Sequence, residues 1–214
     1  MIKKNTIFNE LKDQIISGKL LPNTYLSERN ISDQYKISRT PLREILWRLK
    51  SNGLISRGPS GGYIVRNISL EEICDIFQTR ESIEGIAARI ACLKGDEKFL
   101  VEIKKLGERI KEIDINRNPQ EHVLFGRQLH DIIVITADNP FLLEFYKKLK
   151  DLSALIRNIT KNSHLIEKKS KEAHLKIIDV LNKKDEEKSE KYMREHLKTT
   201  CKLMIETLYP NIFI

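Results

Sequence analysis

The chain has 214 residues, of which 40% are hydrophobic and 32% are charged, the composition of a soluble globular protein with one large domain or two small ones. Its formal net charge of +8 at pH 7 favours polyanionic partners and argues against an acidic tail. No apolar run is long enough to span a membrane, the N-terminal sequence lacks a signal-peptide core, and the three cysteines have no CxxC spacing. These features predict a cytoplasmic protein whose cysteines are reduced and buried.

The N-terminal part of the chain predicts three short helices followed by a hairpin. Residues 4–17 have apolar side chains at helical spacing and are followed by a glycine. A second helix begins at Ser27, whose hydroxyl can cap it, and a third is capped by Ser38 and runs to Gly53. Two short apolar runs joined by the Gly-rich sequence PSGG then predict a β-hairpin. This order of elements indicates a winged helix-turn-helix domain over residues 1–67.

The sequence changes character at residue 69, where SLEE forms a capping box and strand-like alternation ends. Turn and breaker residues then divide the rest of the chain into about six helices, which predicts an all-helical bundle over residues 68–214. The expected fold class is therefore mainly α, with a small β-hairpin wing in the N-terminal domain.

The third helix of the N-terminal domain has two arginines in its first two turns. Its apolar residues form one stripe, consisting of Leu42, Ile45, Leu46 and Leu49. Arg39 and Arg43 fall together to one side of that stripe, at the helix end whose free amides and dipole suit phosphate. Arginine can also bind guanine with two hydrogen bonds in the major groove. On these residues alone, a surface helix with two solvated arginines is an equal alternative. Trp47 lies beyond Arg43 on the polar face, where packing against another domain or subunit is expected.

The run LSERNISDQYKISRTPLREILWRLKSNGLI, followed by GGYIV, closely resembles the winged helix-turn-helix of the GntR family of bacterial transcription regulators. The resemblance implies that this domain binds double-stranded DNA. It assigns DNA contacts to Arg29, Ser38, Arg39, Thr40, Pro41 and Arg43, and the wing tip that enters the minor groove to Gly61 and Gly62. Asn23 stands where the family usually has glycine, and asparagine also tolerates a positive φ, so we expect the turn to survive.

The helical part resembles the FCD branch of the same family, in the segments QTRESIEGIAARIA, LHDIIVITADNPFL and KEAHLKIIDVLNKKDEEKSEKYMREHL. The resemblance implies a homodimer that binds a small effector, often beside a metal, and that acts on a palindromic operator, usually as a repressor. Two other functions remain open. The second domain can serve for dimerisation alone, or the chain can be a metal-dependent hydrolase, although no carboxylate stands out as its general base.

Three histidines align with the apolar faces of three different predicted helices: His130, His174 and His196. Each alone is more simply a core or surface imidazole, but together they can form a three-nitrogen metal site with open positions. The family's metal motif has Asp or Asn four residues before the first histidine, and here that position is Gly126. A neutral three-histidine set would favour Zn²⁺ or Ni²⁺ over harder ions. The alternative is a metal-free pocket in which the imidazoles bond the effector directly.

Arg80 shares its helix face with apolar residues, so its guanidinium is expected to point into the core. Because an unpaired buried cation is costly, Arg80 is a candidate to bind the carboxylate of an effector. An internal salt bridge, for example with Glu84, is the equal alternative. Arg157 is a second, weaker candidate for the effector, and Asp131 is a poor substitute ligand because it lies about 100° round the helix from His130. No role is assigned to the remaining histidines, His122 and His164.

Overall fold

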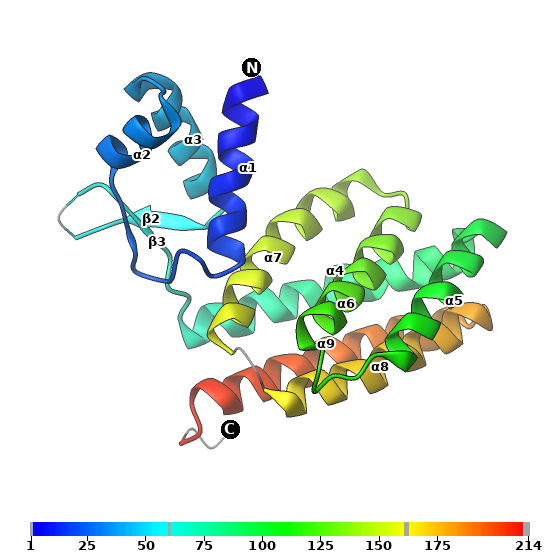
Figure 1. The fold of residues 1–214 in the computed structure, drawn as a ribbon. Coiled ribbons are helices and arrows are strands. Elements are labelled where there is room, and N and C mark those ends of the chain that lie inside the picture. The colour runs from blue at the N-terminus through cyan, green and yellow to red at the C-terminus, as the bar shows by residue number, and fades with distance from the viewer. Residues whose placement is uncertain (1, 60, 161–162, 212–214) are drawn as a thin grey trace. The chain divides into compact units, whose positions relative to one another are not determined.

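The computed structural model describes residues 2–59, 61–160 and 163–211. Over these residues the chain forms nine helices and three short strands (Figure 1). In chain order they are α1 (Ile2–Ile16), β1 (Tyr25–Leu26), α2 (Glu28–Tyr35), α3 (Arg39–Ser51), β2 (Ile55–Arg57), β3 (Tyr63–Val65), α4 (Leu70–Lys94), α5 (Glu97–Glu112), α6 (Pro119–Thr136), α7 (Pro140–Ile159), α8 (His164–Asn182) and α9 (Glu186–Leu208). The mainly helical fold class is confirmed.

The chain divides into two compact units. The first extends to Ser69 and also includes Lys150–Ile159, the second half of α7, and the second unit holds the remaining helices. The segment 150–159 bonds to α1 within the first unit, because Nδ2 of Asn158 donates to the last carbonyl of α1, on Ile16, at 2.7 Å. That bond satisfies one of the acceptors that every helix end leaves open. The predicted boundary at residues 67–68 did not include this segment, because apolar periodicity does not reveal which partner a helix packs against.

The first unit has the expected winged arrangement with one additional strand. Ser27 caps α2, because its hydroxyl accepts from the amide of Asn30 at 3.2 Å. Strands β2 and β3 form the predicted hairpin, and β1, which the sequence did not indicate, pairs antiparallel with β3 to give the order β1-β3-β2. Asn23 has a φ of 67°, so the expected tolerance of asparagine in this turn is confirmed.

The core of the first unit consists of the residues whose spacing predicted helices. The four stripe residues of α3 are all buried, and they pack with the apolar face of α1 and the inner face of the small sheet. Fully enclosed side chains include Ile15, Leu42, Ile45, Leu46, Leu49, Leu54 and Ile55. Burial of each such side chain contributes about 1.5–3 kcal/mol. This core fixes α3 along one side and leaves its other side in solvent.

The second unit is a helical bundle built around two long antiparallel helices. α4 lies along α9, α8 packs on α9, and α5 and α6 complete the bundle against α4 and α8 (Figure 1). The structure corrects the expectation that all three cysteines are buried, because Cys92 is buried whereas Cys74 and Cys201 are half-buried; all three are free thiols. Among the described residues, none of the helices combines the length and apolar character that crossing a membrane would need.

Candidate functional site

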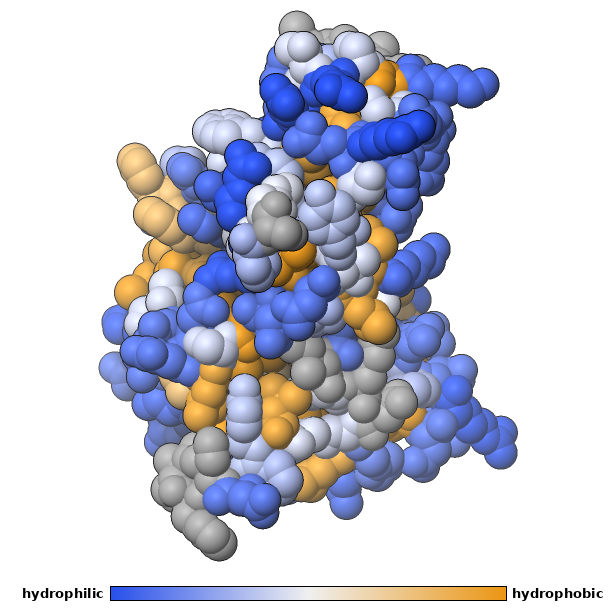
Figure 2. Space-filling model, turned by 90° about the vertical axis from the view of Figure 1, so that its left-hand side faces the viewer, coloured by the Kyte–Doolittle hydropathy of each residue, from blue (hydrophilic) through white to orange (hydrophobic). Residues whose placement is uncertain are grey.

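The N-terminal end of α3 is presented to solvent by the first unit. Arg39, Thr40 and Arg43 are exposed, on the side of α3 opposite its buried stripe. On the face shown in Figure 2, hydrophilic side chains predominate over the part of the first unit that α2 and α3 form. Ser38 occupies the N-cap position as predicted, but its hydroxyl makes no capping hydrogen bond, so the expectation that its side chain caps α3 is wrong. A serine without a capping role keeps its hydroxyl available for another acceptor or donor.

Other predicted DNA-contacting residues surround this helix end. Arg29 is exposed, and so is Gly61, whereas Pro41 and Gly62 are half-exposed. Nε of Arg43 lies 3.3 Å from Oε2 of Glu28, an ion pair that orients the guanidinium from the neighbouring helix. Such an exposed pair adds little stability, so its effect is mainly on the orientation of the side chain.

In the second unit, His130 of α6, His174 of α8 and His196 of α9 come together in the bundle. All three are buried, and one possible ligand atom from each lies within 4.8 Å of the others. Their ring centres are 5.4 Å (His130–His174), 5.2 Å (His130–His196) and 4.6 Å (His174–His196) apart. Three helices that are distant in sequence therefore place three imidazoles around one point.

A buried carboxylate on α4 orients the first of these imidazoles. Oε2 of Glu84 lies 2.5 Å from Nδ1 of His130, and Oε1 accepts from Nε of Arg80 at 2.6 Å. Burial alone would raise the pKa of Glu84, but Arg80 and His130 outweigh it and hold the pKa at about 2. A carboxylate accepts only, so it favours the proton on Nδ1 of His130 and leaves a lone pair on Nε2, which can accept a hydrogen bond from Nε2 of His196 at 3.3 Å.

Gly126 of α6 lies against the ring of His174. A Cβ at this position would be 2.5 Å from Cε1 of His174 and 3.2 Å from Nδ1. Any larger residue at 126, including the family's carboxylate, would therefore displace that ring. The absence of a side chain at Gly126 and the position of His174 depend on each other.

Comparison with known proteins matches both units. The family model of bacterial regulatory proteins of the gntR family matches residues 3–65, and the FCD domain model matches residues 75–199, more than half of the chain. The chain belongs to the GntR family, in its FCD branch. It is 24% identical over 197 residues to the HTH-type transcriptional regulator YdhC of Bacillus subtilis, covering 91% of this chain and 87% of YdhC. It is 23% identical over 210 residues to the HTH-type transcriptional repressor GlaR of Escherichia coli, covering 94% and 95%. The solved structure of E. coli McbR/YncC has the same fold, with a TM-score of 0.80 at 21% identity over 95% of this chain and 97% of that one.

Membership of the GntR family decides the broad class of function. The chain is a DNA-binding transcription regulator, because GntR-family regulators bind DNA. FCD domains, the class of its second unit, bind small effectors. Regulators of this family are not enzymes, which argues against a metal-dependent hydrolase.

The two predicted effector arginines of this GntR-family regulator have different surroundings. Arg80 is buried and bonds Glu84, which is the internal salt bridge that the sequence left open. Arg157 is half-buried and lies in the part of α7 that belongs to the first unit. Asp131 accepts a hydrogen bond from the Tyr146 hydroxyl at 2.7 Å and is not a member of the three-histidine group. Glu84 is thus the carboxylate that acts on the cluster, through His130.

Sequence reasoning missed His122, which is fully buried on α6. Its Nδ1 lies 2.7 Å from Oε2 of Glu167 on α8, and its ring centre is 6.1 Å from that of His174. The signal was present in the spacing, because positions 122, 126 and 130 follow one another at four-residue intervals on one helix face. The prediction treated His122 as a residue near a helix start and did not connect it with Gly126.

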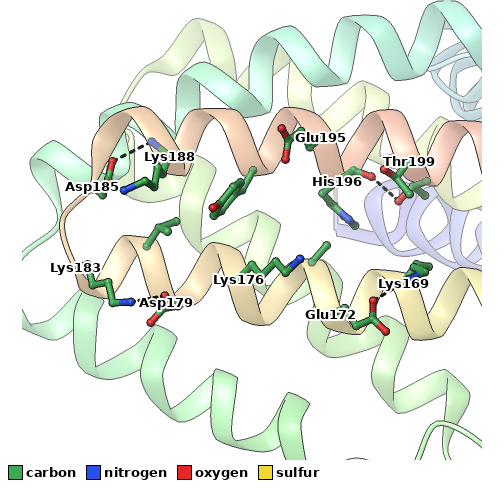
Figure 3. A pocket seen from close by; sticks show the side chains of 14 residues that line it. Lys169, Glu172, Lys176, Asp179, Lys183, Asp185, Lys188, Glu195, His196 and Thr199 are labelled. Atoms are coloured by element: carbon green, nitrogen blue, oxygen red, sulfur yellow. Dashed lines mark hydrogen bonds and ion pairs between the residues drawn. The ribbon is translucent and has the colours of Figure 1, made fainter.

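His196 also borders a surface groove between α8 and α9, with a volume of about 510 Å³. Figure 3 shows His196 projecting from α9 into this groove, among lysines and acids from both helices. Three of the lysines are paired with acids: Lys169 with Glu172, Lys183 with Asp179 and Lys188 with Asp185. The groove therefore reaches one member of the cluster, His196, and its lining has no strong excess of positive charge.

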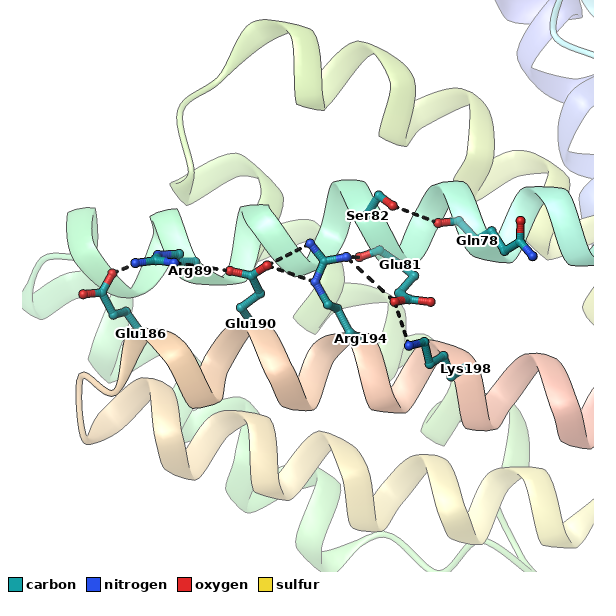
Figure 4. A network of polar contacts seen from close by, with 8 residues as sticks. All are labelled: Gln78, Glu81, Ser82, Arg89, Glu186, Glu190, Arg194 and Lys198. Carbon is teal, nitrogen blue, oxygen red and sulfur yellow. Dashed lines mark hydrogen bonds and ion pairs between the residues drawn. The ribbon is translucent and has the colours of Figure 1, made fainter.

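A chain of partly exposed ion pairs links α4 to α9 beside the carboxylate of Glu84. Arg194 of α9 binds Glu190 at 2.8 Å and lies 3.8 Å from Glu81 of α4, which Lys198 also contacts at 3.2 Å (Figure 4). Gly85 permits this approach, because a Cβ there would be 2.7 Å from Cγ of Arg194. Gly85 directly follows Glu84, so the contact holds the backbone beside the cluster.

The three imidazoles fit a divalent metal ion of the borderline class. An imidazole bound to zinc through one nitrogen has its ring centre about 3.2 Å from the ion, so two imidazoles on one ion have ring centres about 4.5–6.4 Å apart. The three distances between 4.6 and 5.4 Å fall in this range. The Glu84–His130 pair is also the arrangement that commonly orients a metal-binding histidine.

Proposed function

We propose that this chain is a homodimeric repressor whose helical domain binds a divalent metal and a small carboxylate effector. Residues 1–67 would bind a palindromic operator, and residues 68–214 would dimerise and bind the effector. The observation that carries the proposal is the buried cluster of His130, His174 and His196, oriented by Glu84, in a chain whose other unit presents Arg39 and Arg43 to solvent. The relative GlaR is named a transcriptional repressor, which supports the same direction of regulation here.

On DNA, each protomer would place the N-terminal end of α3 in the major groove. Arg39 and Arg43 would contact guanine edges or phosphates, the free amides of the helix end would face phosphate, and the wing tip at Gly61 and Gly62 would enter the minor groove. Two such helices related by a two-fold axis would bind two half-sites, which is why a palindrome is expected.

In the helical domain, His130, His174 and His196 would hold Zn²⁺ or Ni²⁺, and the ion would provide positions for effector oxygens. Arg80 would act through Glu84 by keeping that carboxylate ionised and His130 oriented. Effector binding would change DNA affinity only to the extent that the effector prefers one dimer geometry over another.

The DNA-binding part is tested by titrating fluorescent duplexes, taken from palindromes that flank the gene, at several salt concentrations. The double variant Arg39→Ala/Arg43→Ala should lose about 10- to 100-fold or more in specific affinity and about two units of salt slope if both contact phosphate. Lys50→Ala removes one positive charge from the opposite end of α3 and is the matched control. Unchanged specificity in the double variant would show that α3 is not the recognition helix.

The effector part is tested on untagged protein by metal analysis and by thermal-shift screening of small carboxylates. Bound zinc or nickel at one equivalent per chain, with stabilisation by a carboxylate, is the expected result. Absence of both would favour a helical domain that only dimerises. The metal-free alternative, in which the imidazoles bond the effector directly, would show stabilisation by a carboxylate without metal.

A further inference from the structure

Two of the three cysteines face each other across the long antiparallel helix pair of the second unit. Glu81 of α4 lies 3.8 Å from Arg194 of α9 and accepts a hydrogen bond from it at its backbone carbonyl, which fixes the register of the two helices (Figure 4). Cys74 lies seven residues before Glu81, and Cys201 lies seven residues after Arg194. Because seven residues return to the same helix face to within about 20°, the two cysteines come opposite each other.

The two thiols are in contact and accessible. Burial, and then the Cys74 thiol that is hydrogen-bonded to it, raise the pKa of Cys201 to about 12. Cys74 and Cys201 are free and half-buried, whereas Cys92, the third cysteine, is only 4% exposed. Thiols close enough to hydrogen-bond need only a small movement to reach the disulfide bond length of about 2.05 Å. The pair therefore combines proximity with access for a small oxidant, and Cys92 is enclosed in the core.

We propose that Cys74 and Cys201 form a site of reversible oxidation, at which hydrogen peroxide joins α4 to α9 through an intramolecular disulfide. The Cys74 thiolate attacks one peroxide oxygen, so that an S–O bond forms, the O–O bond breaks and the other oxygen leaves, with a proton, as water. The Cys201 sulfur then attacks the sulfenic sulfur, so that an S–S bond forms, the S–O bond breaks and hydroxide leaves with the Cys201 proton as a second water. Peroxide gains the two electrons that the two thiols lose.

The order of the two steps follows from the protonation of the pair. The thiolate, and not the thiol, is the nucleophile toward peroxide. Because the raised pKa of Cys201 keeps its proton in place at neutral pH, the first attack falls to Cys74. The second step is intramolecular and needs no further encounter, since Cys201 is already beside the sulfenic sulfur. A dithiol reductant reverses the reaction by thiol–disulfide exchange.

The disulfide would restrict the movement of α4 against α9. The ion pairs that link these helices are partly exposed and individually weak, so they permit small shifts that a covalent bond prevents. Cys74 lies in the second turn of α4, which begins at Leu70, directly after the end of the DNA-binding unit at Ser69. The bond also closes a loop of about 130 residues, and closing a long loop restricts the unfolded chain strongly. The oxidised protein should therefore be the more stable form.

The test uses the full-length, untagged protein, first reduced and then treated with hydrogen peroxide. Thiol titration should fall from three thiols per chain to one, and peptide mass spectrometry should find Cys74 joined to Cys201. The midpoint of thermal unfolding should rise by about 5 °C or more, and a dithiol reductant should reverse both changes. Cys74→Ser and Cys201→Ser should form no internal disulfide and show no rise. Cys92→Ala is the matched control and should still lose two thiols and gain the same stability.

The result that would overturn the inference is retention of all three thiols under peroxide that oxidises a free model thiol. A disulfide between two chains, seen as a covalent dimer on a non-reducing gel, would equally refute an internal pair. An internal disulfide that lowers the unfolding midpoint would show that the native helices do not hold the thiols in register. Circular dichroism spectra of the two serine variants that match the reduced wild type would show that their lack of a disulfide is not caused by misfolding.

Discussion

Replacing Gly126 with alanine should disturb the cluster directly, because it introduces the atom that the His174 ring excludes. The new Cβ would be 2.5 Å from Cε1 of His174, whereas carbon atoms in contact are about 3.5–4.0 Å apart, so the ring must withdraw by about 1 Å. Overpacking of this kind costs about 1–3 kcal/mol, and alanine returns up to about 1 kcal/mol through its higher helix propensity. We expect a net loss of about 1–2 kcal/mol in the free energy of unfolding, and zinc affinity at least about tenfold lower because His174 leaves its position.

Gly107→Ala is the matched control for this experiment. Gly107 is a buried glycine of α5 that also faces α8, and its new Cβ would be 3.2 Å from Cγ2 of Ile178, one turn after His174. A shift of a few tenths of an ångström accommodates it, so we expect stability within about 1 kcal/mol of the wild type and unchanged zinc binding. Urea unfolding followed by circular dichroism, and zinc titration against a chromophoric chelator, measure both quantities. If the two variants were equally stable and bound zinc equally well, the His174 ring would not lie against α6.

Four further substitutions test single groups in the two units. The pKa of Glu84 is about 2, below its ordinary value of 4.5, so Glu84 contributes stability above pH 4.5 that is lost as the pH falls toward 2. Arg80→Met should lower the free energy of unfolding at pH 7 by about 3–5 kcal/mol, because it leaves the Glu84 carboxylate buried without its cation. It should also move the acid loss of stability to higher pH, which urea unfolding between pH 3 and 8 would measure. Burial and neighbouring carboxylates raise the pKa of Tyr146, so the wild type should lose stability as the pH rises above 10. Tyr146→Phe should make this loss of stability with pH less steep, at a cost of about 1 kcal/mol at neutral pH. An equally steep loss in the variant would contradict the prediction. Ser27→Ala should cost about 1 kcal/mol because Ser27 caps α2, whereas Ser38→Ala should cost less than about 0.5 kcal/mol and weaken DNA binding.

The sequence predicted those parts of the fold that depend on local periodicity. The α3 stripe from Leu42 to Leu49 is buried as expected, because a period of 3.6 residues is visible in the sequence itself. Strand β1 was missed, because two residues leave no detectable alternation and are defined only by pairing with β3. The assignment of residues 150–159 to the first unit was missed for the same reason, since it depends on contacts such as Asn158 with α1.

In the candidate metal site, too, some residues could be predicted from local sequence patterns and others could not. Apolar stripes on three helices indicated His130, His174 and His196, because each helix face can be read separately. The carboxylates that orient the imidazoles are different, since Glu84 acts on a histidine 46 positions away and Glu167 on one 45 positions away. No local pattern connects such pairs. The i, i+4 relation of Arg80 and Glu84 was the one part of this network within reach of sequence reasoning.

The arrangement of ligands explains how occupancy of the cluster can stiffen the whole second unit. His130, His174 and His196 belong to three helices, and Glu84 adds α4, so an ion bound there would join four helices in addition to their packing, hydrogen bonds and ion pairs. The ion pairs between α4 and α9 are partly exposed and individually weak, so they permit small relative shifts of the two helices. An effector that binds the ion can favour one of these arrangements by as much as its affinities for the two differ. In such a mechanism, Glu84 and its bond to His130 connect the ligand to α4.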